Sequence, residues 1–108
     1  VLALPIAHGE GKFVPREHDV HRRLVEGDQV ALRYVDAGGR PGPHPVNPNG
    51  SVDDVAGLCD PTGRVLALMP HPERFCQVTQ HPRWTRGGID RADGRLLFAR
   101  AKRYLDSD

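Results

Sequence analysis

The stretch VAGLCDPTGRVLALMP, residues 55–70, decides the fold, because it sets two apolar runs on either side of a turn sequence. Residues 60–63, Asp-Pro-Thr-Gly, have Pro early and Gly late, which is typical of a four-residue hairpin turn. The flanking runs, residues 55–59 and 64–69, are therefore predicted to be the two strands of a β-hairpin that ends at Pro70.

A helix and a strand are predicted before the hairpin. Residues 17–26 indicate a short helix, because Val20 and Leu24 share one face and Gly27 follows in the C-cap position. The alternation of QVALRYVD, residues 29–36, is typical of a strand.

The two ends of the chain carry one further strand and one further helix. Residues 1–7 are almost wholly apolar and predict a buried strand, which residues 13–14 resume after two glycines. Residues 95–105 predict a helix capped by Asp93 or Gly94. Mixed helices and strands indicate an α/β or α+β domain.

Two stretches are rich in loop residues. Residues 37–54 contain many glycines and prolines and no periodicity, so they are either a functional loop or disordered. Their segment NPNGS, residues 47–51, favours turns, because Asn tolerates left-handed conformations. Residues 74–92 form the second such stretch.

The composition excludes several classes of protein. The chain has 108 residues, 15 Lys and Arg and 14 Asp and Glu, a balance that gives no electrostatic argument for nucleic acid or a membrane surface. No apolar run is long enough to span a membrane, and no signal peptide is recognisable. Two cysteines are too few for a disulfide scaffold and predict a cytoplasmic protein with reduced thiols. The apolar Val start indicates a piece of a longer protein.

The residues with the clearest chemistry are in MPHPER, residues 69–74, where His71 stands between two prolines and Glu73 follows two residues later. Prolines restrict the backbone, so they can hold these two side chains in one geometry beyond a strand end. A carboxylate that orients one imidazole nitrogen leaves the other to take the proton of a Ser or Cys nucleophile. The alternative is an incidental surface His and Glu in a Pro-rich turn, and the pattern alone leaves both open.

Six histidines raise the question of a metal site. His18 and His21 are three residues apart on the predicted helix and within reach of one ion. No further Cys or His cluster completes a tetrahedral site at a recognised spacing, so we predict solvated histidines and no metal.

The MPHPER segment resembles the His/Glu motif of class I, Cys-His-Glu, glutamine amidotransferases. Together with PIAHGEGKF, QVALRYVD and NPNGS in that order, it makes the chain similar to the glutaminase family of phosphoribosylformylglycinamidine synthases, from Leu4 to about Leu105. This resemblance implies that residues 1–108 are the C-terminal half of a flavodoxin-like α/β amidotransferase domain, with a mixed sheet, flanking helices and one β-hairpin.

The resemblance also implies residue roles. His71 matches the family's general base and Glu73 its orienting carboxylate. Two further segments are implied to lie near the glutamine cleft or the synthetase contact: His8, Gly9 and Glu10, and Asn47, Asn49, Gly50 and Ser51.

The implied activity is hydrolysis of L-glutamine, with ammonia passed to the synthetase component that makes formylglycinamidine ribonucleotide. ATP and Mg²⁺ are expected on that partner, and no cofactor is expected in this chain. The family's nucleophile is a Cys on a glycine-flanked elbow, and neither Cys59 nor Cys76 has flanking glycines. The isolated chain is therefore expected to be inactive, and marginally stable, without the missing N-terminal half of the domain. A truncated chain that only binds the synthetase, and another class I amidotransferase, are the alternatives.

Overall fold

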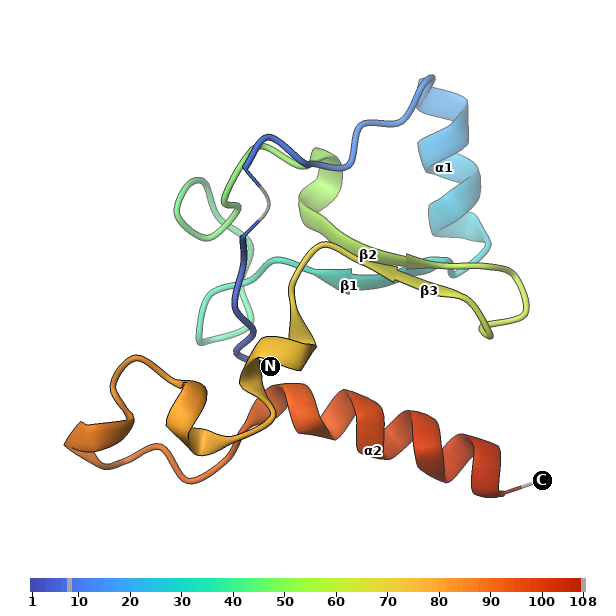
Figure 1. Ribbon diagram of the computed structural model, residues 1–108. Coiled ribbons are helices and arrows are strands. Elements are labelled where there is room, and N and C mark those ends of the chain that lie inside the picture. Colours follow the sequence, from blue (N-terminus) through green and yellow to red (C-terminus); the bar gives the residue numbers. More distant parts are fainter. Residues whose placement is uncertain (8, 108) are drawn as a thin grey trace. The chain divides into compact units, whose positions relative to one another are not determined.

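The computed structural model describes residues 1–7 and 9–107, which form two compact units (Figure 1). The first unit consists of Val1 and His8–Met69, and the second of Leu2–Ala7 and Pro70–Asp108. Each unit has its own arrangement of elements, so the two are taken in turn.

The described part of the first unit contains a three-stranded antiparallel sheet, one α-helix and the short 3₁₀ turn η1 (Val52–Asp54). The strands are β1 (Val30–Arg33), β2 (Val55–Cys59) and β3 (Leu66–Leu68), in the order β1-β2-β3 (Figure 1). The central strand β2 is the most buried, because Val55 and Ala56 are only 2% and 3% exposed. Edge strand β3 is different, since Leu66 remains 49% exposed.

The predicted β-hairpin is confirmed as β2 and β3. Gly57 pairs with Leu68, and Cys59 with Leu66. The turn between them closes through the N–H of Gly63, which donates to the Asp60 carbonyl at 3.0 Å. Gly63 has φ +71°, a left-handed conformation that glycine adopts without steric cost.

The predicted first helix is α1 (His18–Glu26), with Glu17 at its N-cap. Its C-cap is Gly27, as predicted, and the Gly27 N–H donates to the Arg23 carbonyl at 2.9 Å. The left-handed residue that ends the helix is the next one, Asp28, at φ 55°. The chain then enters β1, which lies inside the predicted strand at residues 29–36.

The second unit is built from short turns and one long helix. Three 3₁₀ turns, η2 (Pro72–Phe75), η3 (Val78–Gln80) and η4 (Trp84–Arg86), precede α2 (Asp93–Asp106). Phe75 is buried in this unit, at 4% exposure. Its ring lies 5.6 Å from that of His81, centroid to centroid.

Three expectations from the sequence need correction. Residues 1–7 and 13–14 are not strands, because they have no neighbouring strand to pair with. Segment 2–7 is extended, but it is held by single hydrogen bonds at Ala3 and Pro5. The sheet in the described residues is therefore wholly antiparallel and not mixed.

The caps of α2 are the third correction. Ala92 occupies the N-cap position, and both Asp93 and Gly94 lie inside the first turn, where they are buried. Asp93 does not cap the helix, because its carboxylate is taken up by other donors.

Within residues 1–7 and 9–107, no helix is long and apolar enough to cross a membrane. The same residues include no group of three or more His, Cys, Asp or Glu side chains that is arranged to hold a metal ion. His21 is paired with a carboxylate, since its Nε2 lies 3.0 Å from Oδ2 of Asp53.

Candidate active site

His71 and Glu73, the predicted catalytic pair, lie together in the second unit. His71 is the N-cap of η2, and Pro72 occupies the first position of this turn. The Nδ1 atom of His71 lies 2.6 Å from Oε1 of Glu73, a short hydrogen bond. The tight 3₁₀ turn thus brings two side chains that are two residues apart into direct contact.

The electrostatics of this pair favour an ionised carboxylate. The hydrogen bond with His71 lowers the pKa of Glu73 below its ordinary value. The Glu73 side chain is 57% exposed, whereas His71 is 32% exposed and so half-buried. No other described residue is hydrogen-bonded to the Nε2 atom of His71, so this nitrogen is free to exchange a proton with a reacting group.

The backbone of the turn is fixed from several sides. The N–H of His71 donates to the carbonyl of Pro5 at 2.8 Å, and its carbonyl accepts the N–H of Arg74 at 3.1 Å. The Cys76 thiol donates to the Pro72 carbonyl at 3.4 Å. On the α2 side, a Cβ placed on Gly94 would overlap the Pro72 carbonyl oxygen.

Sequence reasoning missed the supporting residues Pro5, Asp93 and Gly94. The sequence predicts Asp93 or Gly94 as a helix cap and places Pro5 within a strand. The one available signal was an Asp-Gly pair at the start of an amphipathic helix, because glycine in a first turn permits a close approach of another backbone.

The two other candidate segments are brought together in the first unit. Asn49 donates from Nδ2 to the carbonyl of Gly11, and the N–H of Val52 donates to the carbonyl of Phe13 at 3.0 Å. The segment that carries HGEG and the NPNGS loop are therefore neighbours. Gly9 and Glu10 are exposed, and His8 lies outside the described residues.

The NPNGS loop is held in a defined conformation by hydrogen bonds of its own side chains. Asn47 Oδ1 accepts the N–H groups of Gly50 and Ser51, at 3.0 and 3.1 Å. Asn47 Nδ2 donates to Asp54 Oδ1 at 2.9 Å. Ser51 is 5% exposed, and its hydroxyl donates to the Val55 carbonyl at 2.5 Å, so this part of the loop is anchored to β2.

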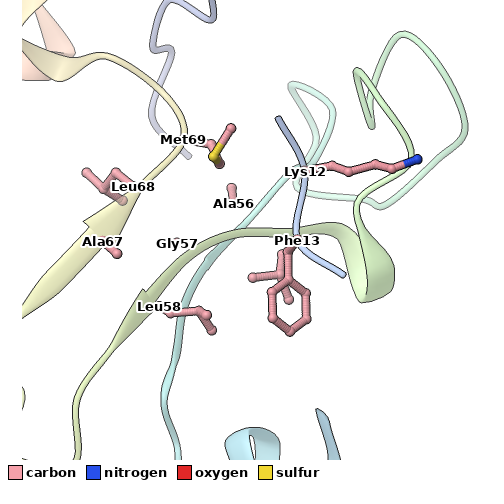
Figure 2. A pocket seen from close by; sticks show the side chains of 9 residues that line it. Lys12, Phe13, Ala56, Gly57, Leu58, Ala67, Leu68 and Met69 are labelled. Atoms are coloured by element: carbon pink, nitrogen blue, oxygen red, sulfur yellow. The ribbon is translucent and has the colours of Figure 1, made fainter. Parts of the chain in front are cut away.

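An apolar pocket of about 240 Å³ lies on the sheet of the first unit (Figure 2). Its lining comes from β2, β3 and the segment after HGEG, and includes Phe13, Leu58, Leu68 and Met69. Among the described residues that line the pocket, Lys12 is the charged one, and Figure 2 shows its side chain extending away from the apolar groups.

The two thiols are both turned to backbone carbonyls. Cys59, in the first unit, lies with its Sγ 3.9 Å from the Asp28 carbonyl, and Cys76 is bonded to Pro72. Within the described part of the second unit, the Cys76 thiol is not hydrogen-bonded to His71.

Comparison with known families identifies a glutamine amidotransferase domain over nearly the whole sequence. The chain belongs to the family of CobB/CobQ-like glutamine amidotransferase domains, whose family model matches residues 1–105. This membership confirms the class of protein that the MPHPER, HGEG and NPNGS segments predict.

Curated relatives narrow the resemblance within that family. The chain is 41% identical over 105 residues to phosphoribosylformylglycinamidine synthase subunit PurQ of Dehalococcoides mccartyi, covering 95% of this chain and 39% of the relative. It is 41% identical over 107 residues to the PurQ subunit of Methanothrix thermoacetophila, covering 98% of this chain and 41% of the relative. It is also 48% identical over 83 residues to phosphoribosylformylglycinamidine synthase of Drosophila melanogaster, covering 76% of this chain and 6% of that protein.

The similarity is thus to PurQ-type amidotransferases, as the resemblance of the sequence predicts. The chain spans 39% and 41% of the length of the first two relatives.

Proposed function

We propose that this chain supplies the general base and its orienting carboxylate to a glutamine amidotransferase that provides ammonia for formylglycinamidine ribonucleotide synthesis. The observation that carries the proposal is the 2.6 Å contact between His71 Nδ1 and Glu73 Oε1. Membership of the amidotransferase family and similarity to PurQ subunits support the choice of substrate, L-glutamine.

The mechanism follows from the roles that this contact permits. With Glu73 on Nδ1, the Nε2 of His71 accepts the proton of a cysteine thiol, and the thiolate attacks the carboxamide carbon of glutamine. His71 then returns the proton to the departing nitrogen, which leaves as ammonia, and a γ-glutamyl thioester remains. Water, deprotonated by His71, hydrolyses the thioester to glutamate and regenerates the thiol. Glu73 stabilises the imidazolium that forms twice in this cycle.

The nucleophile in this proposal comes from outside the 108 residues. The positions of Cys59 and Cys76, each turned to a backbone carbonyl, support this choice. The isolated chain should then lack glutaminase activity until a segment carrying the cysteine is supplied.

The proposed partners follow from the same reaction. Ammonia is consumed by a synthetase component, which would hold ATP and Mg²⁺, and this chain would need no cofactor of its own. The segments with Gly9 and Glu10 and with Asn47 to Ser51 are proposed to face the glutamine cleft or that partner, as is His8.

The experiment replaces His71 by Ala in the complete amidotransferase subunit that carries this chain, assayed with the synthetase. Glutamine-dependent synthesis should be abolished, while synthesis from added ammonium salt should persist, because the synthetase reaction does not use His71. Unchanged glutamine-dependent activity, or equal loss of both activities, would overturn the assigned role.

A second experiment separates the catalytic proposal from a chain that only binds the synthetase. The chain is mixed with the cysteine-bearing part of the subunit, and glutamate release is measured. Activity that appears only in the mixture supports the proposal. Binding to the synthetase without glutamate release in that mixture favours the non-catalytic alternative.

A further inference from the structure

The proposed reaction leaves one buried ionisable group of the second unit without a role. Asp93 is 7% exposed, yet its carboxylate accepts the N–H of Ala3 at Oδ2, at 2.8 Å, and the Nε–H of Arg91 at Oδ1, at 2.6 Å. Burial is the largest single influence and by itself raises the pKa of Asp93, but the hydrogen bonds from Ala3 and Arg91, together with nearby positive charge, bring the pKa below its ordinary value. A buried, ionised carboxylate is costly unless it is paired, so its position requires an explanation.

The partner of Asp93 belongs to a segment that also touches the His71 turn. Ala3 and Pro5 are two residues apart in the extended segment 2–7. Ala3 is bonded to Asp93, and the Pro5 carbonyl accepts the N–H of His71 at 2.8 Å. Asp93 therefore holds the strip of backbone to which His71 itself is bonded.

Within the second unit, these hydrogen bonds and packing contacts form a closed ring of linked residues that begins and ends at His71. From His71 the path runs to Pro5, along the segment to Ala3, and across to Asp93. The next residue, Gly94, packs against Pro72, which adjoins His71 in the chain. Such a ring of contacts restrains the backbone of His71 more than a single hydrogen bond does, because no residue in it can move without disturbing its neighbours.

We propose that Asp93 is a positioning residue for glutamine hydrolysis, which acts by binding the Ala3 amide and so fixing segment 2–7 against the His71 backbone. This inference rests on the proposed function of His71. Misplacement of a reacting group by about 1 Å costs roughly a hundredfold in rate. Loss of the Asp93 link should therefore lower the turnover of glutamine rather than its binding.

The test uses Asp93→Ala and Asp93→Asn in the complete subunit assayed with its synthetase. Asp93→Ala should lower kcat for glutamine hydrolysis by about 10- to 100-fold, with little change in the KM for glutamine. Asp93→Asn should recover most of this loss, because the amide oxygen still accepts the Ala3 N–H. Asp90→Ala, which removes an exposed carboxylate three residues earlier, is the matched control and should keep the original kcat.

A second variant, Ala3→Pro, tests the link without touching Asp93. Proline at position 3 removes the N–H donor, and its fixed φ of about −65° is compatible with an extended segment. Its kcat should fall as in Asp93→Ala, and the double variant should be no worse than either single one. A normal kcat in Ala3→Pro overturns the inference even if Asp93→Ala fails to fold.

The results for the Asp93 and Ala3 variants can be distinguished from the result for His71→Ala, which tests the proposed function. If His71→Ala abolishes glutamine-dependent activity while Asp93→Ala and Ala3→Pro keep full kcat, only the role of Asp93 is wrong. If His71→Ala keeps that activity, the proposed function fails, and the role of Asp93 in it fails with it.

Discussion

Gly94 and Pro72 lie so close together that a Cβ on Gly94 would overlap the carbonyl oxygen of Pro72. That Cβ would also be only 2.7 Å from the carbonyl oxygen of Phe75. The first turn of α2 therefore lies directly against the backbone of η2, and only glycine permits this approach. The geometry of the turn next to His71 therefore depends on the absence of a Cβ at position 94.

Replacing Gly94 by Ala should separate α2 from η2, because backbone atoms cannot yield as a flexible side chain does. Overpacking of this kind costs about 1–3 kcal/mol of unfolding free energy. Hydrogen exchange at the α2 amides measures this loss in the complete subunit. Glutamine-dependent activity should fall along with amide protection in this helix.

The control for this prediction is Gly42→Ala. A Cβ at Gly42 would meet the side chain of Val46 at 3.4 Å or more, an ordinary contact, and its φ is not left-handed. Equal protection in the Gly94 and Gly42 variants would show that the close approach carries no energetic consequence.

Glu73→Gln should lower kcat for glutamine hydrolysis by about 10²- to 10⁴-fold, the range of general acid–base contributions. The amide has no charge to stabilise the imidazolium of His71. Ammonia-dependent synthesis should stay unchanged, which distinguishes lost catalysis from lost assembly. The comparison is made by steady-state kinetics with glutamine and with ammonium salt.

The pH dependence of the same pair has a defined direction. Hydrogen bonding to His71 lowers the pKa of Glu73 below its ordinary value of 4.5. The stabilisation of the pair is therefore fully present above 4.5 and is lost as the pH falls through the lowered value. Carboxyl-carbon NMR titration should find the Glu73 pKa below 4.5 in the wild type and closer to 4.5 in His71→Ala.

The parts of this structure that could be predicted are those that a local pattern determines. The β2–β3 hairpin follows from the turn chemistry of residues 60–63, and α1 from the spacing of Val20 and Leu24. The contact of His71 with Glu73 was predictable for the same reason, because the two residues are close in the chain and the prolines restrict the backbone between them.

The parts that could not be predicted depend on distant partners. Residues 1–7 have the apolar composition of a strand, but a strand exists only beside another strand, and composition does not say whether one is present. The Ala3–Asp93 bond joins residues 90 positions apart. A local pattern predicts that an Asp before a helix is an N-cap, so it cannot predict that Asp93 is a buried acceptor for a distant residue.

Asp53 connects α1 to β1 through two side chains, and its replacement by Asn should weaken the first unit. Oδ2 of Asp53 lies 2.8 Å from Arg33 and 3.0 Å from His21. Both side chains of the Arg33 pair are partly exposed, so the expected loss of unfolding free energy is under about 1 kcal/mol. Hydrogen exchange at the β2 amides provides the measurement.

The control for this prediction is a substitution at Asp28, because Asp28 shares the left-handed φ of Asp53. Asp28 makes no side-chain ion pair with described residues, so Asp28→Asn should leave the stability unchanged.

The contribution of Asp53 depends on pH. Hydrogen bonds with Arg33, the larger cause, and with His21 lower the pKa of Asp53 below its ordinary value of 3.8. The stabilisation is thus complete above 3.8 and disappears as the pH falls through the lowered pKa, so a constant gap between variant and wild type across this range would contradict it.

The hairpin turn offers the most direct test of a hydrogen bond on a carboxyl pKa. The Thr62 hydroxyl donates to Asp60 Oδ2 at 2.6 Å, while Oδ1 accepts the N–H groups of Arg64 and Val65. With the Thr62 bond as the largest cause, these donors lower the pKa of Asp60 to about 2. Thr62→Val should raise it toward 3.8, as measured by carboxyl-carbon NMR titration.

The same substitution predicts a stability change with a definite pH window. Because the pKa of Asp60 is depressed on folding, its contribution is fully present above 3.8 and is lost as the pH falls toward about 2. Thr62→Val should therefore reduce protection of the β2–β3 amides near neutral pH and should converge with the wild type toward pH 2. Thr85→Val, at an exposed residue of η4, should leave both the Asp60 pKa and this protection unchanged. An Asp60 pKa that stays near 2 in Thr62→Val would assign the shift to the backbone donors, which the turn would then supply whatever side chain stands at position 62.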